Sequence, residues 1–280
     1  VLSLRGHQVS LWERDKVLGG TARVAALAYE PNGRIVRYLK NALAELPVNI
    51  ELGKSANSEN INAAGFDTVI LATGARRRAP DIAGKQLSHV LDGEELRDML
   101  FAGNARGKLN WHQRLLTRLS GALGLSRNID LMRKLSHVYM PLGKRVCIIG
   151  GGLVGLEVAE LLAERGRQVT VLEAGRDLGA ELSLVRRWRV LHQLKEHGVE
   201  LHRNAAVREI TADRVMFTQG ESEAHTVADN VIIAVGAEPD SDLRQQFASL
   251  KVDLHSIGDS AEIGYIEGAI RSARELAVSL

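Results

Sequence analysis

The pattern of hydrophobic and polar residues predicts a strand, a helix and a second strand near the middle of the chain. Val146–Ile149 is an unbroken apolar run rich in β-branched residues, which is typical of a fully buried strand. Leu156–Glu164 has apolar residues at helical spacing, and Gln168–Leu172 is again apolar and β-branched. The second strand ends at an acid, Glu173. The pattern therefore predicts an α/β unit.

Three glycines join the first strand to the helix at G-x-G-x-x-G spacing. Gly150 allows a sharp turn, Gly152 has no side chain to block a pyrophosphate, and Gly155 allows close packing of helix and sheet. Glu173 follows directly after the second strand, where its carboxylate can accept hydrogen bonds from both ribose hydroxyls. We interpret this stretch as a dinucleotide site; the alternative is a glycine-rich turn in an ordinary α/β unit.

The chain repeats itself, with its second half matching its first at one constant offset. RGHQVSLWE at 5–13 matches RGRQVTVLE at 165–173, and Leu18 and Gly19 match Leu178 and Gly179. Further matching segments are predicted as a helix followed by a strand, and as a late strand that ends at glycine. They are Arg34–Leu46, Val48–Leu52 and Thr68–Gly74 in the first half, and Arg186–His197, Val199–His202 and Val231–Gly236 in the second.

The repeat predicts an α/β fold with two tandem Rossmann-like dinucleotide-binding domains. The counterpart of Gly150 would precede Val1, so we expect the first domain to lack its opening strand and its glycine loop, and the chain to belong to a longer protein. We expect one dinucleotide-binding domain at 1–84 and 251–280 and the other at 85–250.

A helical insertion is predicted at 97–143, inside the second domain. It holds eight Lys and Arg residues against two Asp, with leucines at helical spacing. It is either a solvated helical hairpin or a basic surface that docks a partner or covers a site.

Composition excludes several other classes of protein. Apolar residues make up 45% and charged residues 25%, the net charge is +2, and no apolar run is long enough to span a bilayer. We therefore expect a cytoplasmic protein that binds neither nucleic acid nor membrane, with no secretory signal in VLSLRGHQVS. The single cysteine, Cys147, lies in a predicted strand as a core residue and leaves no Cys-x-x-Cys pair. The nine histidines show no grouping that predicts a metal site.

Two short glycine motifs and a late Gly-Asp pair complete an ordered set with the repeat. They are Ala72–Gly74 (ATG), Ala234–Gly236 (AVG) and Gly258–Asp259 before a C-terminal helix at Tyr265–Leu280. The set resembles the two-dinucleotide-domain flavoproteins related to glutathione reductase. Within them it is most similar to the C-terminal FAD/NAD(P)-binding portion of the NADH:flavin oxidoreductase family, which includes 2,4-dienoyl-CoA reductase and trimethylamine dehydrogenase.

This resemblance implies that the domain at 1–84 and 251–280 binds FAD and that the domain at 85–250 binds NAD(P), and it implies roles for residues of both domains. For FAD it implies Glu13, Arg14, Gly19, Gly20, Thr21, Ala72, Thr73, Gly74, Gly258 and Asp259. For NAD it implies Gly150, Gly152, Leu153, Val154, Gly155, Glu173 and Gly236, with Glu157 near the nicotinamide. Other interpretations stay open: Glu13 as an exposed strand-end acid, Arg14 as a solvated residue, Asp259 as a helix N-cap and Glu157 as a charge that complements a helix dipole.

The expected function is transfer of hydride from NADH to FAD and onward to a further redox centre. NADH is preferred to NADPH because Glu173 would repel a 2′-phosphate, an effect that Arg176 nearby would soften. The resemblance implies an N-terminal barrel that holds FMN and an iron–sulfur cluster and acts on enoyl-type or amine substrates. The alternatives are a stand-alone NADH:ferredoxin or quinone reductase, whose basic insertion docks an acidic carrier protein, and a non-catalytic nucleotide-binding domain.

Overall fold

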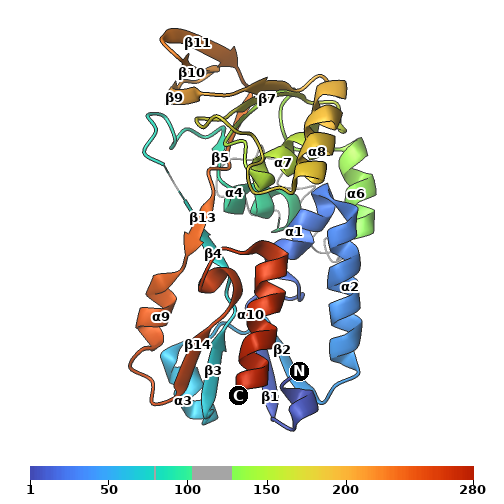
Figure 1. Ribbon diagram of the computed structural model, residues 1–280, viewed down its shortest axis with the longest axis vertical. Coiled ribbons are helices and arrows are strands. Elements are labelled where there is room, and N and C mark those ends of the chain that lie inside the picture. The colour runs from blue at the N-terminus through green and yellow to red at the C-terminus, as the bar shows by residue number, and fades with distance from the viewer. Residues whose placement is uncertain (79, 103–127) are drawn as a thin grey trace. The chain divides into compact units, whose positions relative to one another are not determined.

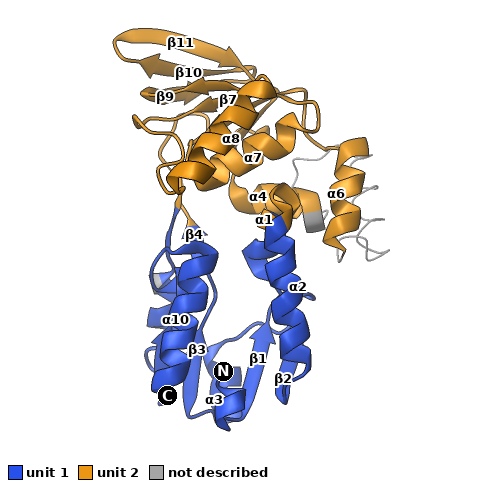
Figure 2. Cartoon of the chain, turned by 45° about the vertical axis from the view of Figure 1, so that its right-hand side comes forward, with its two compact units in different colours: residues 1–24, 31–76, 237–280 blue, residues 25–30, 77–236 orange. Residues whose placement is uncertain are grey.

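The computed structural model describes residues 1–78, 80–102 and 128–280. The central part of the predicted insertion, 103–127, lies outside the described residues. The chain divides into two compact units, shown in Figure 2. The first comprises residues 1–24, 31–76 and 237–280, and the second comprises residues 25–30 and 77–236.

The second unit contains a five-stranded sheet with the strand order β5-β12-β6-β7-β8 (Figure 1). Every strand pair of this sheet is parallel. Its strands are β5 (Val90–Leu91), β12 (Asn230–Ile233), β6 (Arg145–Ile149), β7 (Gln168–Leu172) and β8 (Glu200–His202). Its helices are α4 (Gly93–Arg97), α6 (Ile129–Val138), α7 (Leu153–Ala163) and α8 (Leu184–Glu196).

Alternation along β6 explains how this sheet is covered on its two faces. Val146 and Ile148 pack into one core with residues of α7 and α8, which lie side by side (Figure 1). Cys147 and Ile149 point the other way, into a second core. That core is closed by an antiparallel sheet of β9 (Ala205–Ile210), β10 (Arg214–Gln219) and β11 (Ser222–Val227). Our sequence analysis did not predict this antiparallel sheet.

The first unit is built from shorter sheets. β1 (Val9–Glu13) pairs in parallel with β2 (Val48–Leu52), and β14 (Asp253–Ser256) pairs in parallel with β3 (Thr68–Leu71). Among the described residues no strand joins these two pairs, whereas β6 takes that place in the second unit. The remaining elements are α1 (Gly20–Ala28), α2 (Glu30–Ala44), α3 (Ser58–Ala64), β4 (Ala75–Arg77), β13 (Ala237–Pro239), α9 (Ser241–Phe247) and α10 (Tyr265–Ser279).

The predicted fold class is therefore confirmed, including the incomplete first repeat and helices on either side of the predicted insertion's centre. The compact units place residues 237–250 with the first unit, and residues 25–30 and 77–84 with the second. Which unit binds FAD and which binds NAD(P) stays a prediction.

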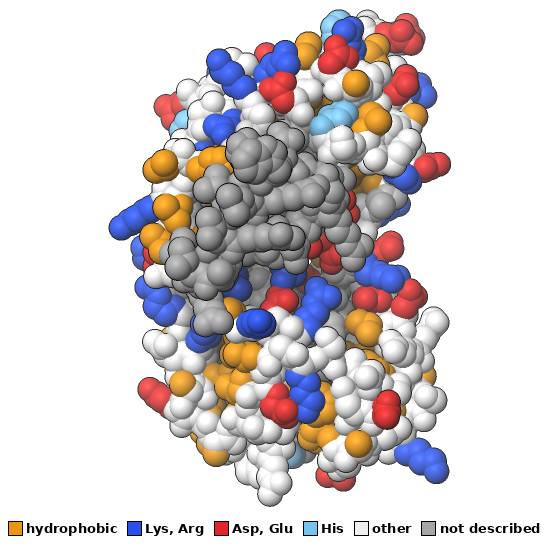
Figure 3. Space-filling model, turned by 180° about the vertical axis from the view of Figure 1, so that it is seen from behind, with side chains coloured by type: hydrophobic (Ala, Val, Ile, Leu, Met, Phe, Trp, Pro, Cys, Tyr) orange, Lys and Arg blue, Asp and Glu red, His pale blue; other side chains and the backbone are white. Residues whose placement is uncertain are grey.

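Surface charge follows the near-neutral composition. On the face shown in Figure 3, Lys and Arg side chains are interspersed with Asp and Glu side chains. None of the described helices combines the length and the apolar character that crossing a bilayer requires.

Candidate functional site

The glycine loop of the second unit follows β6 and leads directly into α7. Gly150 has φ +108°, and its amide donates to the carbonyl of Leu172 at 2.8 Å. A Cβ on Gly150 would lie 2.4 Å from the carbonyl oxygen of Ala234. A Cβ on Gly155 would lie 1.9 Å from the carbonyl oxygen of Gly150. Both positions therefore require glycine, because a side chain would push the loop off the sheet or the helix off the loop.

The first turn of α7 presents backbone amides at the positive end of the helix dipole. Gly152 is the N-cap residue and offers no side chain to satisfy those amides. Leu153 and Val154 form the first turn. This arrangement of glycine loop and helix N-terminus fits a dinucleotide pyrophosphate, since amide donors and a positive partial charge face the same point.

Glu173 stands at the end of β7, beside this loop. One carboxylate oxygen accepts from the Gly151 amide at 2.6 Å, and the other accepts from the Gly175 amide at 2.6 Å. Each carboxylate oxygen can accept a second hydrogen bond. Glu173 is thus held in place by the backbone and keeps acceptor capacity for ribose hydroxyls.

The first unit repeats the hydrogen bonds around this acid. Glu13 accepts from the amide of Asp15 at 2.9 Å, and its carbonyl accepts from Lys54. Glu173 accepts from Gly175, the counterpart of Asp15 in the repeat, and its carbonyl accepts from Ala205. The sequence repeat is therefore also a repeat of backbone geometry at both strand-end acids.

The other residues expected to bind FAD fall on loops and helix ends of the first unit. Gly19, Gly20 and Gly74 have φ values of +119°, +44° and +79°. Thr21 lies in the first turn of α1, and Arg14 is exposed. Ala72 and Thr73 are exposed directly after β3. These positions are compatible with the expected roles and do not by themselves assign a ligand.

Gly258 and Asp259 precede α10. The amide of Gly258 donates to the hydroxyl of Ser272 at 2.8 Å, and a Cβ on Gly258 would lie 3.1 Å from Ala269. Oδ1 of Asp259 accepts from the amides of Gly264 and Tyr265, both at 2.9 Å. Asp259 therefore binds the two amides at the start of α10 from a preceding turn, whereas the N-cap residue of that helix is Gly264. A bond to the ribityl chain stays a prediction.

Glu157 lies in α7, and its side chain is only 12% exposed. It forms an ion pair with Arg186 of α8, whose guanidinium stacks 4.6 Å from the ring centre of Tyr29. Burial raises the pKa of Glu157, and the charge of Arg186 acts against that increase. Glu157 is thus a buried, paired carboxylate; its predicted place near a nicotinamide remains a prediction.

Gly236 follows β12, in the same position relative to its strand as Gly74 relative to β3. Its φ is +97°, and its carbonyl accepts from the amide of Arg78 at 3.2 Å. In the second unit the structure brings Gly150, Gly152, Gly155 and Glu173 together around one loop.

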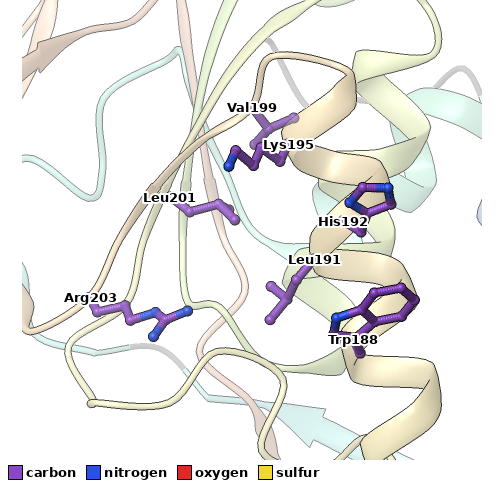
Figure 4. A pocket seen from close by; sticks show the side chains of 7 residues that line it. All are labelled: Trp188, Leu191, His192, Lys195, Val199, Leu201 and Arg203. Carbon is purple, nitrogen blue, oxygen red and sulfur yellow. The ribbon is translucent and has the colours of Figure 1, made fainter.

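A separate hollow of about 450 Å³ opens on the flank of α8, beside the edge strand β8 (Figure 4). It is lined by Trp188, Leu191, His192, Lys195, Val199, Leu201 and Arg203. None of these belongs to the glycine loop. Across the described residues, no group of three His, Cys, Asp or Glu side chains could hold a metal ion.

Three residues near the site were missed by sequence reasoning. Arg186 pairs with Glu157, and Tyr29 stacks on the guanidinium of Arg186; both come from distant parts of the chain, and no local pattern identifies them. Glu181 accepts from the Leu153 amide at 3.2 Å. The repeat gives a signal for Glu181, because it pairs this residue with Thr21, which was expected near a pyrophosphate.

Comparison with known proteins assigns the chain to a family. The profile of the pyridine nucleotide-disulphide oxidoreductases matches residues 16–258. The chain belongs to this family. Bilirubin reductase of Mediterraneibacter gnavus is 33% identical over 264 residues, which cover 94% of this chain and 35% of that protein.

Two solved structures share the fold. A 2-naphthoyl-CoA reductase aligns with a TM-score of 0.81 at 23% identity, over all of this chain and 37% of that chain. Histamine dehydrogenase from Rhizobium sp. 4-9 aligns with a TM-score of 0.73 at 20% identity, over all of this chain and 39% of its own. The resemblance inferred from the sequence is confirmed: the chain belongs to an oxidoreductase family, and it shares the fold of these two larger enzymes.

Proposed function

We propose that the chain is an FAD-dependent NADH oxidoreductase module that passes hydride from NADH to FAD and on to a further redox centre. The observation that carries this proposal is the glycine loop of the second unit, with Glu173 fixed beside it by two backbone amides. The family match and the repeated geometry around Glu13 support it. When bound, the two cofactors supply hydride transfer between nicotinamide and flavin.

In this proposal the residues of the chain bind the two cofactors and orient them. The amides of Leu153 and Val154 at the start of α7 would hold the NADH pyrophosphate. Glu173 would accept from the ribose hydroxyls, and Gly236 would allow close approach of the backbone. In the first unit Glu13, with Arg14 beside it, would hold the ribose of FAD. The backbone of Gly19, Gly20 and Thr21 would follow the pyrophosphate of FAD. The segment Ala72, Thr73 and Gly74 would pass close to the cofactor. Asp259 would contact its ribityl chain.

Glu173 supports a preference for NADH over NADPH. A 2′-phosphate would meet a carboxylate that the backbone holds in place, and like charges at this distance repel. The exposed Arg176 reduces that repulsion only in part. The preference is tested by comparing kcat/KM for the two coenzymes; a higher value with NADPH contradicts it.

The electron acceptor lies beyond this chain in the proposal. The chain spans 35% of the length of bilirubin reductase and 37% of the naphthoyl-CoA reductase chain. We propose an N-terminal barrel with FMN and an iron–sulfur cluster that acts on an enoyl-type or amine substrate. The name of the histamine dehydrogenase supports an amine substrate, and that of the naphthoyl-CoA reductase supports reduction of an unsaturated acyl thioester.

Disulfide reduction is not proposed for this chain, despite the family's name. Cys147 is the single cysteine of the sequence. Its side chain is fully buried, and burial raises its pKa to about 12. A dithiol exchange needs two cysteines and an accessible thiolate.

The experiment is an anaerobic titration of the full-length, FAD-loaded protein with NADH. We expect the yellow absorbance of the oxidised flavin to bleach with stoichiometric NADH. Retention of the yellow colour with bound NADH would favour the non-catalytic alternative instead.

The stand-alone reductase remains a second candidate because residues 97–143 hold eight Lys and Arg against two Asp. A basic docking surface would make electron transfer to an acidic carrier fall steeply with ionic strength. Rates of carrier reduction measured at low and at physiological salt separate the two candidates, since transfer within one polypeptide would change little.

A further inference from the structure

The segment that follows β7 folds back over the glycine loop. Leu178 is fully buried against it, and a Cβ on Gly151 would lie 2.3 Å from the Leu178 side chain. The amide of Gly179 donates to the carbonyl of Gly151 at 2.7 Å. The backbone between Glu173 and Leu182 is thus anchored to the loop at several points, and the side chains that follow Gly179 have a fixed starting position.

Glu181 extends from this anchored segment to the start of α7. One carboxylate oxygen accepts from the amide of Leu153 at 3.2 Å, and the other would lie 2.8 Å from a Cβ on Gly152. A carboxylate is therefore positioned at the helix N-terminus, at the point where the proposed function requires a pyrophosphate.

The repeat supplies an independent comparison. The alignment of the two halves pairs Glu181 with Thr21, which lies in the first turn of α1. Thr21 carries a neutral hydroxyl that can donate to a phosphate oxygen. An ionised Glu181 cannot donate and repels a negatively charged ligand. The two units therefore differ in charge at equivalent positions, and the carboxylate lies in the unit expected to release its nucleotide in every turnover.

We propose that Glu181 is an internal competitor for the dinucleotide pyrophosphate and sets the affinity of the site. In the nucleotide-free protein its carboxylate takes the Leu153 amide. Entry of NAD(H) requires that carboxylate to leave, because two anionic groups cannot share one helix N-terminus. This inference rests on the proposed function and adds to it a residue that weakens coenzyme binding.

If Glu181 only stabilised the helix, its variants would show a different change in affinity for a pyrophosphate ligand. A carboxylate at a helix N-terminus stabilises the helix through its dipole, so removing it lowers the thermal stability under either interpretation. Only the competitor role makes the variant bind a pyrophosphate ligand more tightly. The sign of the affinity change therefore separates the two.

The test is calorimetric titration of the full chain with ADP-ribose, which contains the pyrophosphate, and with adenosine, which does not. Glu181→Gln removes the charge and keeps the shape, and Glu181→Ala removes the competitor altogether. Glu223→Gln on β11 is the matched control, because Glu223 is exposed and lies in the antiparallel sheet, which does not include the strands that carry the loop. Melting temperatures establish that each variant is folded.

We expect both Glu181 variants to bind ADP-ribose roughly tenfold more tightly than the wild type, the size of one charge-assisted hydrogen bond. Adenosine affinity should not change, and Glu223→Gln should behave as wild type. Equal or weaker binding of ADP-ribose by the Glu181 variants overturns the inference and leaves the proposed function standing. Failure of the wild type and all variants to bind ADP-ribose overturns both.

Discussion

Carboxylates of the second unit take different roles according to what surrounds them. Glu173 is held by two amides beside the glycine loop, and Glu181 takes the helix amide of Leu153. Glu157 is buried and depends on Arg186 for its charge partner. The side chains are chemically identical, so their surroundings alone distinguish the acid proposed to orient a ligand, the acid proposed to compete with it and the buried, ion-paired acid.

The pair of Glu157 and Arg186 gives a prediction for stability. Arg186→Met leaves a buried carboxylate without its partner, which should lower the free energy of unfolding by about 3 kcal/mol at neutral pH. Burial raises the pKa of Glu157, so its carboxylate is less favoured in the folded state than in the unfolded state, and the charge of Arg186 offsets that effect. Ionisation of Glu157 therefore costs stability as pH rises through the folded pKa.

The loss in Arg186→Met should accordingly shrink when the pH is lowered, because a carboxyl with a raised pKa takes up a proton sooner than an exposed one. Urea unfolding of the wild type and of Arg186→Met at pH 7.5 and pH 5 measures the loss in unfolding free energy at each pH. The double variant with Glu157→Gln should be more stable than Arg186→Met alone at pH 7.5. A loss that is the same at both pH values would show that the ion pair is not its cause.

Cys147 gives a prediction for reactivity. A fully buried thiol with a pKa of about 12 holds almost no thiolate near pH 8. Iodoacetamide should leave the native protein unmodified and should add one group per chain once the protein is unfolded in urea. Mass spectrometry reports both states, and alkylation of the folded protein at pH 8 would contradict the burial of this residue.

At the scale of elements, the strand, glycine loop and helix form one close-packed unit. Gly150 and Gly155 each lack space for a Cβ, so β6, the loop and α7 keep their spacing only with glycine at these positions. The meander of β9, β10 and β11 then closes the face of the sheet that α7 and α8 leave open. The sheet that contains β6 is therefore stabilised on one face by its close packing against α7 and on the other by the second core.

Gly155→Ala tests this packing. The added Cβ would lie 1.9 Å from the Gly150 carbonyl oxygen, so α7 must move away from the loop. We expect a loss of about 2 kcal/mol or more in unfolding free energy and at least tenfold weaker binding of ADP-ribose. Gly268→Ala in α10 is the control, because nothing lies within 4 Å of its Cβ and alanine favours a helix. Similar behaviour of the two variants would exclude close packing as the reason for glycine at position 155.

At the scale of the whole molecule, the two units repeat the same order of elements, but only the second has a continuous sheet. The second unit has a continuous five-stranded sheet between two cores. The first has two separate parallel pairs and a small core of Ile61, Leu71, Phe247 and Leu250. Short sheets with little buried apolar surface open more readily, so the units should differ in local stability.

Hydrogen exchange of the full chain measures that difference. Amides of β6, β7 and β12 should exchange at least roughly tenfold more slowly than those of β1, β2, β3 and β14. Addition of ADP-ribose should slow exchange in α7 and β7 of the second unit. Equal protection of both units would show that the missing central strand does not weaken the first.

Much of the site followed from sequence because its signals are local. The spacing of Gly150, Gly152 and Gly155 follows from the steric needs of a strand–turn–helix, and Glu173 follows from the length of the helix and the second strand. The repeat required no structure to detect, because matching residues at one offset are visible in the printed chain. The family match confirms the class of protein inferred from these signals.

The partners of those residues depended on contacts between distant segments. Glu157 was identified, but Arg186 and Tyr29 come from other parts of the chain, and the amides held by Glu173 and Glu181 are set by how the segment after β7 folds back. The antiparallel sheet of β9–β11 was missed because its three segments are poorly periodic in the sequence.

The sequence by itself determined the order of strand, glycine loop, helix and acid, and the duplication of that order, because backbone sterics and element lengths act over a few residues. Only the tertiary structure decided which groups occupy the loop and which face of the sheet each core covers. Those contacts join residues far apart in the chain, and their geometry exists only once the sheet has formed.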